Sequence, residues 1–218
     1  MRRLPRLSLP TLGCGLLLLV HTAVAGQRFS EGLHYHRIDP PQPLEAQREP
    51  GHVEVVEMFL YACPHCYELA PRLKRWLKAR PYVDFHRMPA IVGPSWADQA
   101  RAHYIAEALG GGDRLQQALF EAIHEDGREI YNAPAVIAFF VDQGFEARRV
   151  RDLYHSPEIM AKVNEARAKT VAYRLRGVPA VVVDGRYVTA PYFVRSQEEM
   201  LEVLGQLVDR ERAASRSR

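Results

Sequence analysis

The chain has 218 residues, of which 47% are hydrophobic and 25% charged, and its formal net charge is +3 at pH 7. These values are typical of a soluble globular protein with one domain, or with one domain that carries a sizeable insertion. Arg2, Arg3 and Arg6 account for the whole basic excess, so the remaining chain is about neutral and gives no argument for binding nucleic acid or a membrane surface.

Residues 1–25 have the pattern of a cleavable secretory signal peptide. A basic start precedes an apolar run over residues 12–20, and the small residues 23–25 follow, which places the expected cleavage after position 25. A lipoprotein signal would carry its cysteine after the apolar run, whereas Cys14 precedes most of it. An uncleaved anchor would need about 20 apolar residues without interruption. We therefore expect export into an oxidising compartment.

The first elements expected after the signal form a strand–helix–strand unit. Residues 34–38 can form a short edge strand, which ends before a Pro-Pro pair. Residues 52–61 predict a strand that is buried on both faces, because apolar side chains do not alternate there with polar ones. A helix follows, with Cys63 at its N-cap and Pro64 at its first position, and residues 82–88 predict a second strand.

The sequence becomes helical between residues 95 and 174. Five helices are expected there, over residues 97–109, 113–124, 133–143, 146–154 and 157–175. The strand pattern returns at residues 180–183 and 186–189, and the Asp-Gly pair between them is typical of a tight hairpin turn. A last helix is expected from a cap at Ser196 to about Arg210.

This order of elements predicts an α/β fold in which two parts of one sheet flank a block of helices. We expect the first part over residues 26–94, an inserted all-helical domain over 95–174, and the second part over 175–212. Residues 213–218 are basic, and we expect them to form a flexible, solvated tail.

Cys63 and Cys66 are the only cysteines that remain after removal of the signal peptide with Cys14. A closed zinc site needs four ligands, and the sequence offers neither a second cysteine pair nor suitably spaced histidines. An inert disulfide across so short a loop would remove little entropy from the unfolded chain. A redox-active pair is the interpretation that fits best.

The position of Cys63 predicts a stabilised thiolate. A sulfur at a helix N-terminus meets free backbone N–H groups and the positive end of the helix dipole, and His65 can add a positive charge or a hydrogen bond. The pKa of Cys63 should therefore lie below the usual value of about 8.5, which makes this sulfur a good leaving group and the disulfide a strong oxidant. Cys66 should be less exposed and should act when the mixed disulfide is resolved.

Glu57 lies on the predicted strand that leads to the cysteine pair. Its neighbours on the same face are apolar, and buried acids are rare in proteins unless they have a function. We expect Glu57 to relay a proton to or from Cys66, directly or through water. The alternative is a glutamate at an exposed position of the strand.

These features resemble those of the DsbA-type thiol:disulfide oxidoreductases, which are thioredoxin-fold proteins of the bacterial periplasm. The segment CPHCY at 63–67 is similar to the family's active site, and RGVPAVVVDGRY at 176–187 is similar to its cis-proline loop and hairpin. Residues 120–145 resemble part of the family's inserted helical domain. The resemblance covers nearly all of the chain after the signal, and it implies a thioredoxin fold interrupted by an inserted all-helical domain.

The resemblance also implies roles for residues outside the cysteine motif. Pro179 would be a cis proline packed against the cysteine pair, which leaves the backbone of Val178 free to pair with an extended substrate. Glu57 matches the family's buried acid, and Arg87 is the candidate for the basic residue near it. The family often carries a second acid four residues after the second cysteine, but this chain has Ala70 there.

Glu68, two residues before that position, is the acid nearest to it in the sequence. For this reason, we do not apply the family's proton-transfer scheme to this chain.

Together these observations predict a periplasmic dithiol oxidase that donates the Cys63–Cys66 disulfide to unfolded exported proteins with free cysteines. Pro64 and His65 would support the active site, and a membrane partner of the DsbB type would reoxidise it. We expect a monomer that needs no cofactor or metal. The nearest alternative is a disulfide reductase or isomerase on the same fold, although the Pro-His dipeptide favours the oxidase. A metal-binding chaperone is an alternative of another class.

Overall fold

The computed structural model describes residues 28–47 and 49–216. The predicted signal peptide, residues 1–25, lies outside the described residues. No helix in the described part of the chain is both long enough and apolar enough to cross a bilayer.

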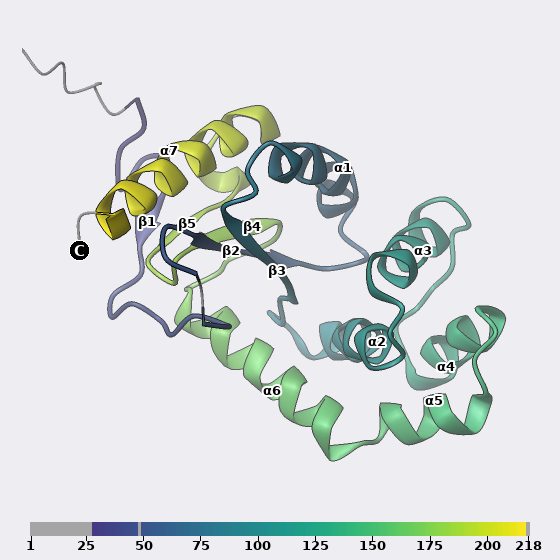
Figure 1. Ribbon diagram of the computed structural model, residues 1–218. Helices are drawn as coiled ribbons and strands as arrows, with labels where there is room; N and C mark the ends of the chain where they lie inside the picture. Colours follow the sequence, from purple (N-terminus) through teal and green to yellow (C-terminus); the bar gives the residue numbers. More distant parts are fainter. Residues whose placement is uncertain (1–27, 48, 217–218) are drawn as a thin grey trace, which may run out of the picture.

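The centre of the structure is a mixed sheet of five strands in the order β1-β5-β4-β2-β3 (Figure 1). Strand β2 (Val53–Phe59) pairs in parallel with β3 (Val83–Pro89) and antiparallel with β4 (Ala180–Val183). Strand β5 (Tyr187–Thr189) continues the hairpin, and β1 (His36–Arg37) pairs with β5 at the sheet edge. The two β-containing parts of the sequence therefore form one sheet, as predicted.

Helices cover both faces of this sheet. Helices α1 (Pro64–Lys78) and α7 (Gln197–Arg216) lie on one face, where Val55, Leu73 and Leu204 belong to the same buried cluster. Helix α6 (Pro157–Ala172) runs along the other face, and side chains of this helix join the β2 and β4 side chains in a second cluster. Because both faces are covered, all seven residues of β2 are buried.

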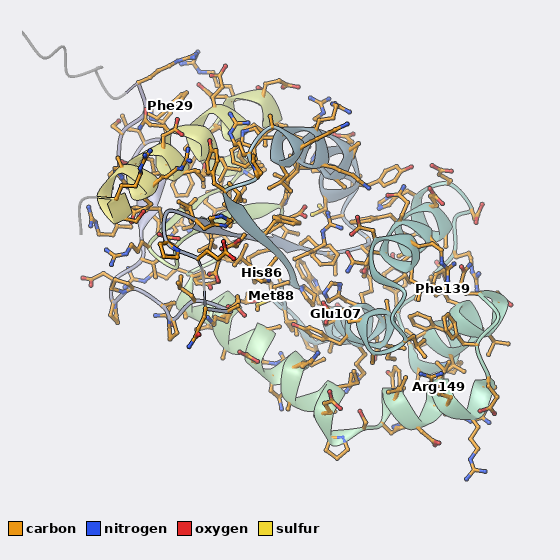
Figure 2. The ribbon with its side chains drawn as sticks, viewed as in Figure 1. Phe29, His86, Met88, Glu107, Phe139 and Arg149 are labelled. Atoms are coloured by element: carbon orange, nitrogen blue, oxygen red, sulfur yellow. The ribbon has the colours of Figure 1, made fainter. Side chains whose placement is uncertain are left out.

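The inserted block begins with a 3-10 turn at Pro94–Trp96. It continues as α2 (Ala97–Ala108), α3 (Gly112–His124), α4 (Ala133–Asp142) and α5 (Ala147–Tyr154), and ends with α6. Figure 2 shows Phe139 pointing into this block, where the apolar faces of the helices meet. The five helices lie where the sequence pattern places them.

The start of several of these helices is fixed by a side chain. Asn132 accepts a hydrogen bond from the backbone N–H of Ala135 (3.0 Å) at the start of α4. Ser156 accepts one from the N–H of Ile159 (3.2 Å) at the start of α6. These caps satisfy N–H groups that have no partner within the helix, and they explain why the helices begin at these residues.

The hairpin between β4 and β5 contains the predicted Asp-Gly turn. Asp184 and Gly185 both have positive φ angles, 49° and 60°, as a type I′ turn requires. A Cβ atom at Gly185 would lie 2.2 Å from the carbonyl oxygen of Gln42, so only glycine fits there. The turn thereby holds the N-terminal segment against the sheet.

Helix α7 extends further than the sequence pattern indicates. The sequence predicts an end near Arg210 and a flexible tail over 213–218, whereas the helix continues to Arg216. Arg212 places its guanidinium over the ring of Tyr82, 3.6 Å from the ring centroid. The difference arises because the stem of a long basic side chain can cover apolar surface while its charged end lies over an aromatic ring. A count of charged residues does not reveal such packing.

Candidate active site

The turn between strand β2 and helix α1 presents Cys63. This residue is the N-cap of α1, with an extended backbone (φ −84°, ψ 114°), and Pro64 follows at the first helical position. The carbonyl oxygen of Cys63 accepts hydrogen bonds from the N–H groups of Cys66 (3.0 Å) and Tyr67 (3.1 Å), which begin the helix. The helix start therefore lies directly beneath the Cys63 side chain.

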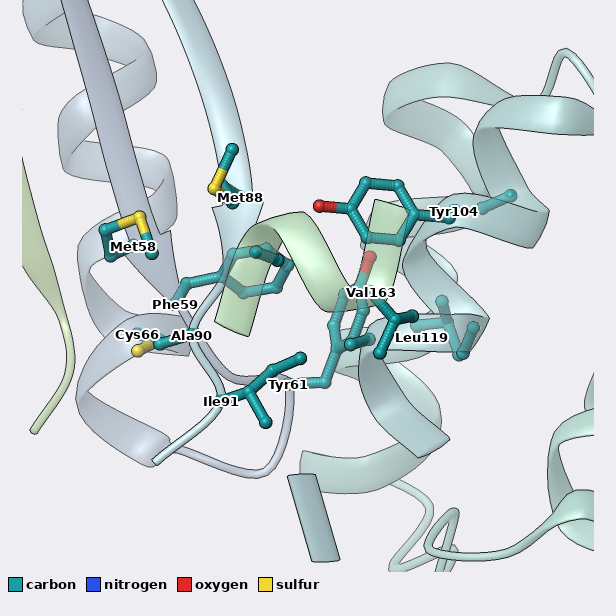
Figure 3. Close-up of a cluster of buried hydrophobic side chains, with 14 of the residues drawn as sticks. Met58, Phe59, Tyr61, Cys66, Met88, Ala90, Ile91, Tyr104, Leu119 and Val163 are labelled. Atoms are coloured by element: carbon teal, nitrogen blue, oxygen red, sulfur yellow. The ribbon is translucent and has the colours of Figure 1, made fainter. Parts of the chain in front are cut away.

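The two cysteines are free thiols with different surroundings. Cys63 is half-buried, whereas Cys66 is buried. Figure 3 shows Cys66 within a cluster of apolar side chains that includes Met58 and Ala90. One sulfur of the pair is thus accessible and the other is enclosed.

These surroundings move the two pKa values apart. A hydrogen bond from the Cys66 thiol is the main influence that lowers the pKa of Cys63, to about 6, and the N–H groups of Cys66 and His65 and the charge of His65 add to it against the effect of burial. Burial raises the pKa of the Cys66 thiol, and the hydrogen bond to Cys63 raises it further. Cys63 is therefore the thiolate of the pair near neutral pH, while Cys66 keeps its proton.

The loop before strand β4 brings Val178 and Pro179 to the same place. The peptide bond between them is cis, as the resemblance implies. When it carries its proton, the Cys63 thiol donates a hydrogen bond to the carbonyl oxygen of Val178, at 3.5 Å, across 115 residues of sequence. The backbone of Val178 thus lies next to the sulfur that is set up to react.

Glu57 is buried beneath the cysteine pair, with no exposed side-chain surface. Its Oε2 atom accepts a hydrogen bond from Nε of Arg87 at 2.7 Å, and the two residues are direct neighbours in the β2–β3 register. Arg87 also donates to Oε1 of Gln116 on α3 (3.0 Å). The alternative of an exposed strand position is therefore wrong, and Arg87 is indeed the basic neighbour of this acid. The charge of Glu57 also contributes, after burial, to the raised pKa of Cys66.

His65 and Glu68 lie on the exposed side of the first turn of α1. His65 Nδ1 is 3.6 Å from Glu68 Oε2, so Glu68 faces the motif histidine, while Ala70 is buried. The backbone oxygen of His65 accepts a hydrogen bond from Gln197 of α7 (2.9 Å). Within residues 28–47 and 49–216, no three His, Cys, Asp or Glu side chains gather as metal ligands.

Two residues at this site were not identified from the sequence. Gln99 on α2 accepts a hydrogen bond from the N–H of Ala62 (2.9 Å), and His124 at the end of α3 contacts the carbonyl oxygen of Tyr61 through Nε2 (2.6 Å). The partner of His124 is 63 residues away, and no local pattern marks such a pair. The helical insertion therefore reaches the active-site turn with two polar side chains.

A thioredoxin fold with an accessible, acidic cysteine at a helix N-terminus, a buried partner thiol and a cis-proline loop beside them defines a thiol:disulfide oxidoreductase. The profile of the DSBA-like thioredoxin domain matches residues 54–201. The chain belongs to this family, which confirms the predicted fold and enzyme class.

Curated relatives and solved structures agree with this assignment. The thiol:disulfide interchange protein DsbA of Burkholderia cepacia is 33% identical over 180 residues, 82% of this chain and 84% of that protein. The crystal structure of oxidoreductase DsbA from Xylella fastidiosa is 35% identical, with a TM-score of 0.73 over 83% of this chain and 96% of that one. The crystal structure of Pseudomonas aeruginosa DsbA is 31% identical, with a TM-score of 0.78 over 86% and 97% of the two chains.

Proposed function

We propose that the protein oxidises pairs of thiols in newly exported proteins, with the Cys63–Cys66 disulfide as the acceptor of two electrons. The observation that carries this proposal is the contrast between the two sulfurs. Cys63 has a pKa lowered to about 6, whereas the pKa of Cys66 is raised by its burial. A stabilised Cys63 thiolate favours the reduced enzyme, so the disulfide is an oxidant.

The exchange proceeds in two steps that balance in electrons and protons. A substrate thiolate attacks the Cys63 sulfur, the Cys63–Cys66 bond breaks, and the Cys66 thiolate that leaves takes up a proton. A second thiolate of the substrate then attacks the substrate sulfur of the mixed disulfide, and Cys63 leaves as a thiolate. The substrate is oxidised by two electrons, and the enzyme becomes a dithiol.

Two nearby groups have a part in these steps. The Val178 backbone lies 3.5 Å from the Cys63 sulfur, measured from its carbonyl oxygen, which suits the pairing of an extended substrate segment beside the bond that reacts. The charge of Glu57 acts on Cys66, so Glu57 is the candidate that relays the proton to the leaving thiolate. Pro64 and His65 shape the helix start that stabilises Cys63.

The enzyme would work in the periplasm as a monomer and would be reoxidised by a membrane partner of the DsbB type. Its relatives are named as thiol:disulfide interchange proteins, and residues 1–25 have the pattern of an export signal. Unfolded exported proteins with free cysteines are the substrates that this location supplies.

The proposal is tested by the equilibrium between the native enzyme and mixtures of reduced and oxidised glutathione. An oxidase gives a high proportion of dithiol enzyme in an oxidising mixture, whereas a strongly reducing equilibrium would point to the reductase or isomerase alternative. Alkylation at pH 5 separates the metal chaperone alternative. A Cys63 with a pKa of about 6 still reacts there, because about one tenth of it is ionised, whereas an ordinary thiol is almost inert.

A further inference from the structure

One peptide bond of the active-site turn is held on both sides by the helical insertion. The bond joins Tyr61 to Ala62, immediately before Cys63. Its N–H group, on Ala62, donates to Oε1 of Gln99 at 2.9 Å, and its carbonyl oxygen, on Tyr61, lies 2.6 Å from Nε2 of His124. A carbonyl oxygen can only accept, so His124 carries a proton on Nε2.

His124 also contacts the other side of the cysteine motif. Its ring is stacked on the ring of Tyr67, with centroids 4.8 Å apart and an angle of 11° between the planes. Tyr67 directly follows Cys66, and its hydroxyl donates to Glu125, the neighbour of His124. The end of α3 thus contacts residues on both flanks of the Cys63–Cys66 segment.

The side chain of Gln99 is buried although its hydrogen bonding is incomplete. Only 1% of its surface is exposed, and its Nε2 atom is buried without a hydrogen-bond partner among the described residues. Burying a donor without an acceptor costs free energy, so the fold would be more stable with a residue at position 99 that has no such donor. Its bond to the Ala62 N–H is the contact that accounts for a glutamine at this position.

We propose that Gln99 and His124 are positioning residues for thiol–disulfide exchange, because they fix the peptide that carries Cys63 and so hold its sulfur over the start of helix α1. The thioredoxin-fold part alone supplies no side chain to this peptide among the described contacts. The helical insertion is therefore part of the redox site, in addition to any role in binding substrates.

The geometry explains why small movements matter here. The groups that stabilise the Cys63 thiolate are the Cys66 thiol and the N–H groups of His65 and Cys66, all of which belong to α1. The peptide at Tyr61–Ala62 sets where the chain enters that helix. If it turns, the sulfur moves away from these donors, whose hydrogen bonds weaken steeply with distance and angle.

The test compares two removals with two matched variants. Gln99→Met removes the acceptor at similar size, and His124→Phe keeps a ring against Tyr67 but removes the donor. His124→Gln keeps a donor near the Nε2 position without the ring. Gln206→Met is the control, because Gln206 also holds a backbone segment, bonding to N and O of Phe29 at 3.0 and 2.7 Å, and Phe29 belongs to a different buried cluster from Cys66.

For each variant, the pKa of Cys63 is measured from the ultraviolet absorbance of the thiolate, and the redox equilibrium is measured against glutathione. We expect Gln99→Met and His124→Phe to raise this pKa by about half a unit to one unit, and to shift the equilibrium about threefold to tenfold towards the disulfide. We expect His124→Gln and Gln206→Met to stay within about twofold of the native equilibrium.

The positioning role is rejected if Gln99→Met and His124→Phe lower the thermal stability of the reduced and oxidised forms equally, with both redox readouts unchanged. It is also rejected if His124→Gln shifts them as much as His124→Phe. Should Gln99→Met fail to fold, the two His124 variants decide the question. This inference rests on the proposed redox role of Cys63, and the two fail separately, since a reducing native enzyme contradicts the function whatever the variants do.

Discussion

At the scale of single residues, the site depends on an asymmetry between two thiols that are identical in the unfolded chain. Cys63 stands at a helix start with donors around it, and Cys66 is enclosed by apolar side chains. The thiol of Cys66 is itself the largest influence on Cys63. The buried cysteine therefore acts on the chemistry of the accessible one before any disulfide forms.

This dependence predicts the effect of removing the Cys66 thiol. We expect Cys66→Ala to raise the pKa of Cys63 towards its ordinary value, because the strongest donor is lost. Cys66→Ser keeps a hydroxyl donor and should raise it less. The pH dependence of the alkylation rate measures both values, and equal pKa values in the two variants would contradict the assigned donor.

The buried ion pair of Glu57 and Arg87 leads to a second prediction. We expect Arg87→Met to lower the free energy of unfolding by about 3–5 kcal/mol, because it leaves the carboxylate of Glu57 buried without its partner. The double variant Glu57→Gln with Arg87→Met removes both charges and should recover part of this loss. Urea unfolding of the oxidised forms measures the difference, and equal losses in the single and double variants would contradict it.

The sequence alone identified those site residues that a pattern of neighbouring positions marks. The spacing of Cys63 and Cys66 and the placement of Pro64 are visible within one short segment, and Glu57 stands out as an acid among apolar neighbours. Gln99 and His124 were missed because a buried glutamine and a histidine at a helix end are common in any helical domain. Only the folded arrangement shows that both act on one peptide bond.

At the scale of elements, helix starts were easier to predict than helix ends. Asn132 and Ser156 directly precede α4 and α6, and a proline lies within the first two positions of each helix, so both starts are marked in the sequence. The end of α7 was placed too early, because its last turns are held by contacts of basic side chains rather than by an apolar stripe.

The helix caps of the insertion lead to a prediction about stability that does not involve the redox reaction. We expect Ser156→Ala to lower the free energy of unfolding by about 1 kcal/mol, because the N–H of Ile159 loses its acceptor at the start of α6. The redox equilibrium should not change, since α6 begins at its connection to α5, on the opposite side of the molecule from α1 (Figure 1). Ser156→Asp, which keeps an acceptor, is the control and should remain close to native stability. A shifted equilibrium in Ser156→Ala would show that the insertion affects the site through its overall stability.

At the scale of the whole molecule, the redox state and the stability of the fold are linked. The pKa of Cys63 lies at about 6 in the folded reduced protein, below the usual value of about 8.5. The thiolate therefore stabilises the folded reduced form, fully above the usual pKa of about 8.5, and this contribution is lost as the pH falls through about 6. The oxidised form has no such group.

We therefore expect the reduced protein to unfold at a higher temperature than the oxidised protein at pH 8, and the difference to shrink as the pH is lowered below about 6. Thermal midpoints of both forms across this range test the linkage. A difference that grows on acidification would contradict it. The variant Cys63→Ser, which cannot form the thiolate, should lose the pH dependence that arises from this group.

Because the insertion divides the sheet, the parts of the active site are synthesised at different times. Strand β2 pairs with β4 across the whole helical block, as Val55 does with Val183, so the cysteine segment emerges well before the proline loop that completes its surroundings. Until that loop is in place, the Cys63 sulfur lacks the carbonyl oxygen of Val178 beside it, so the complete redox site forms only after the last part of the sheet has joined β2.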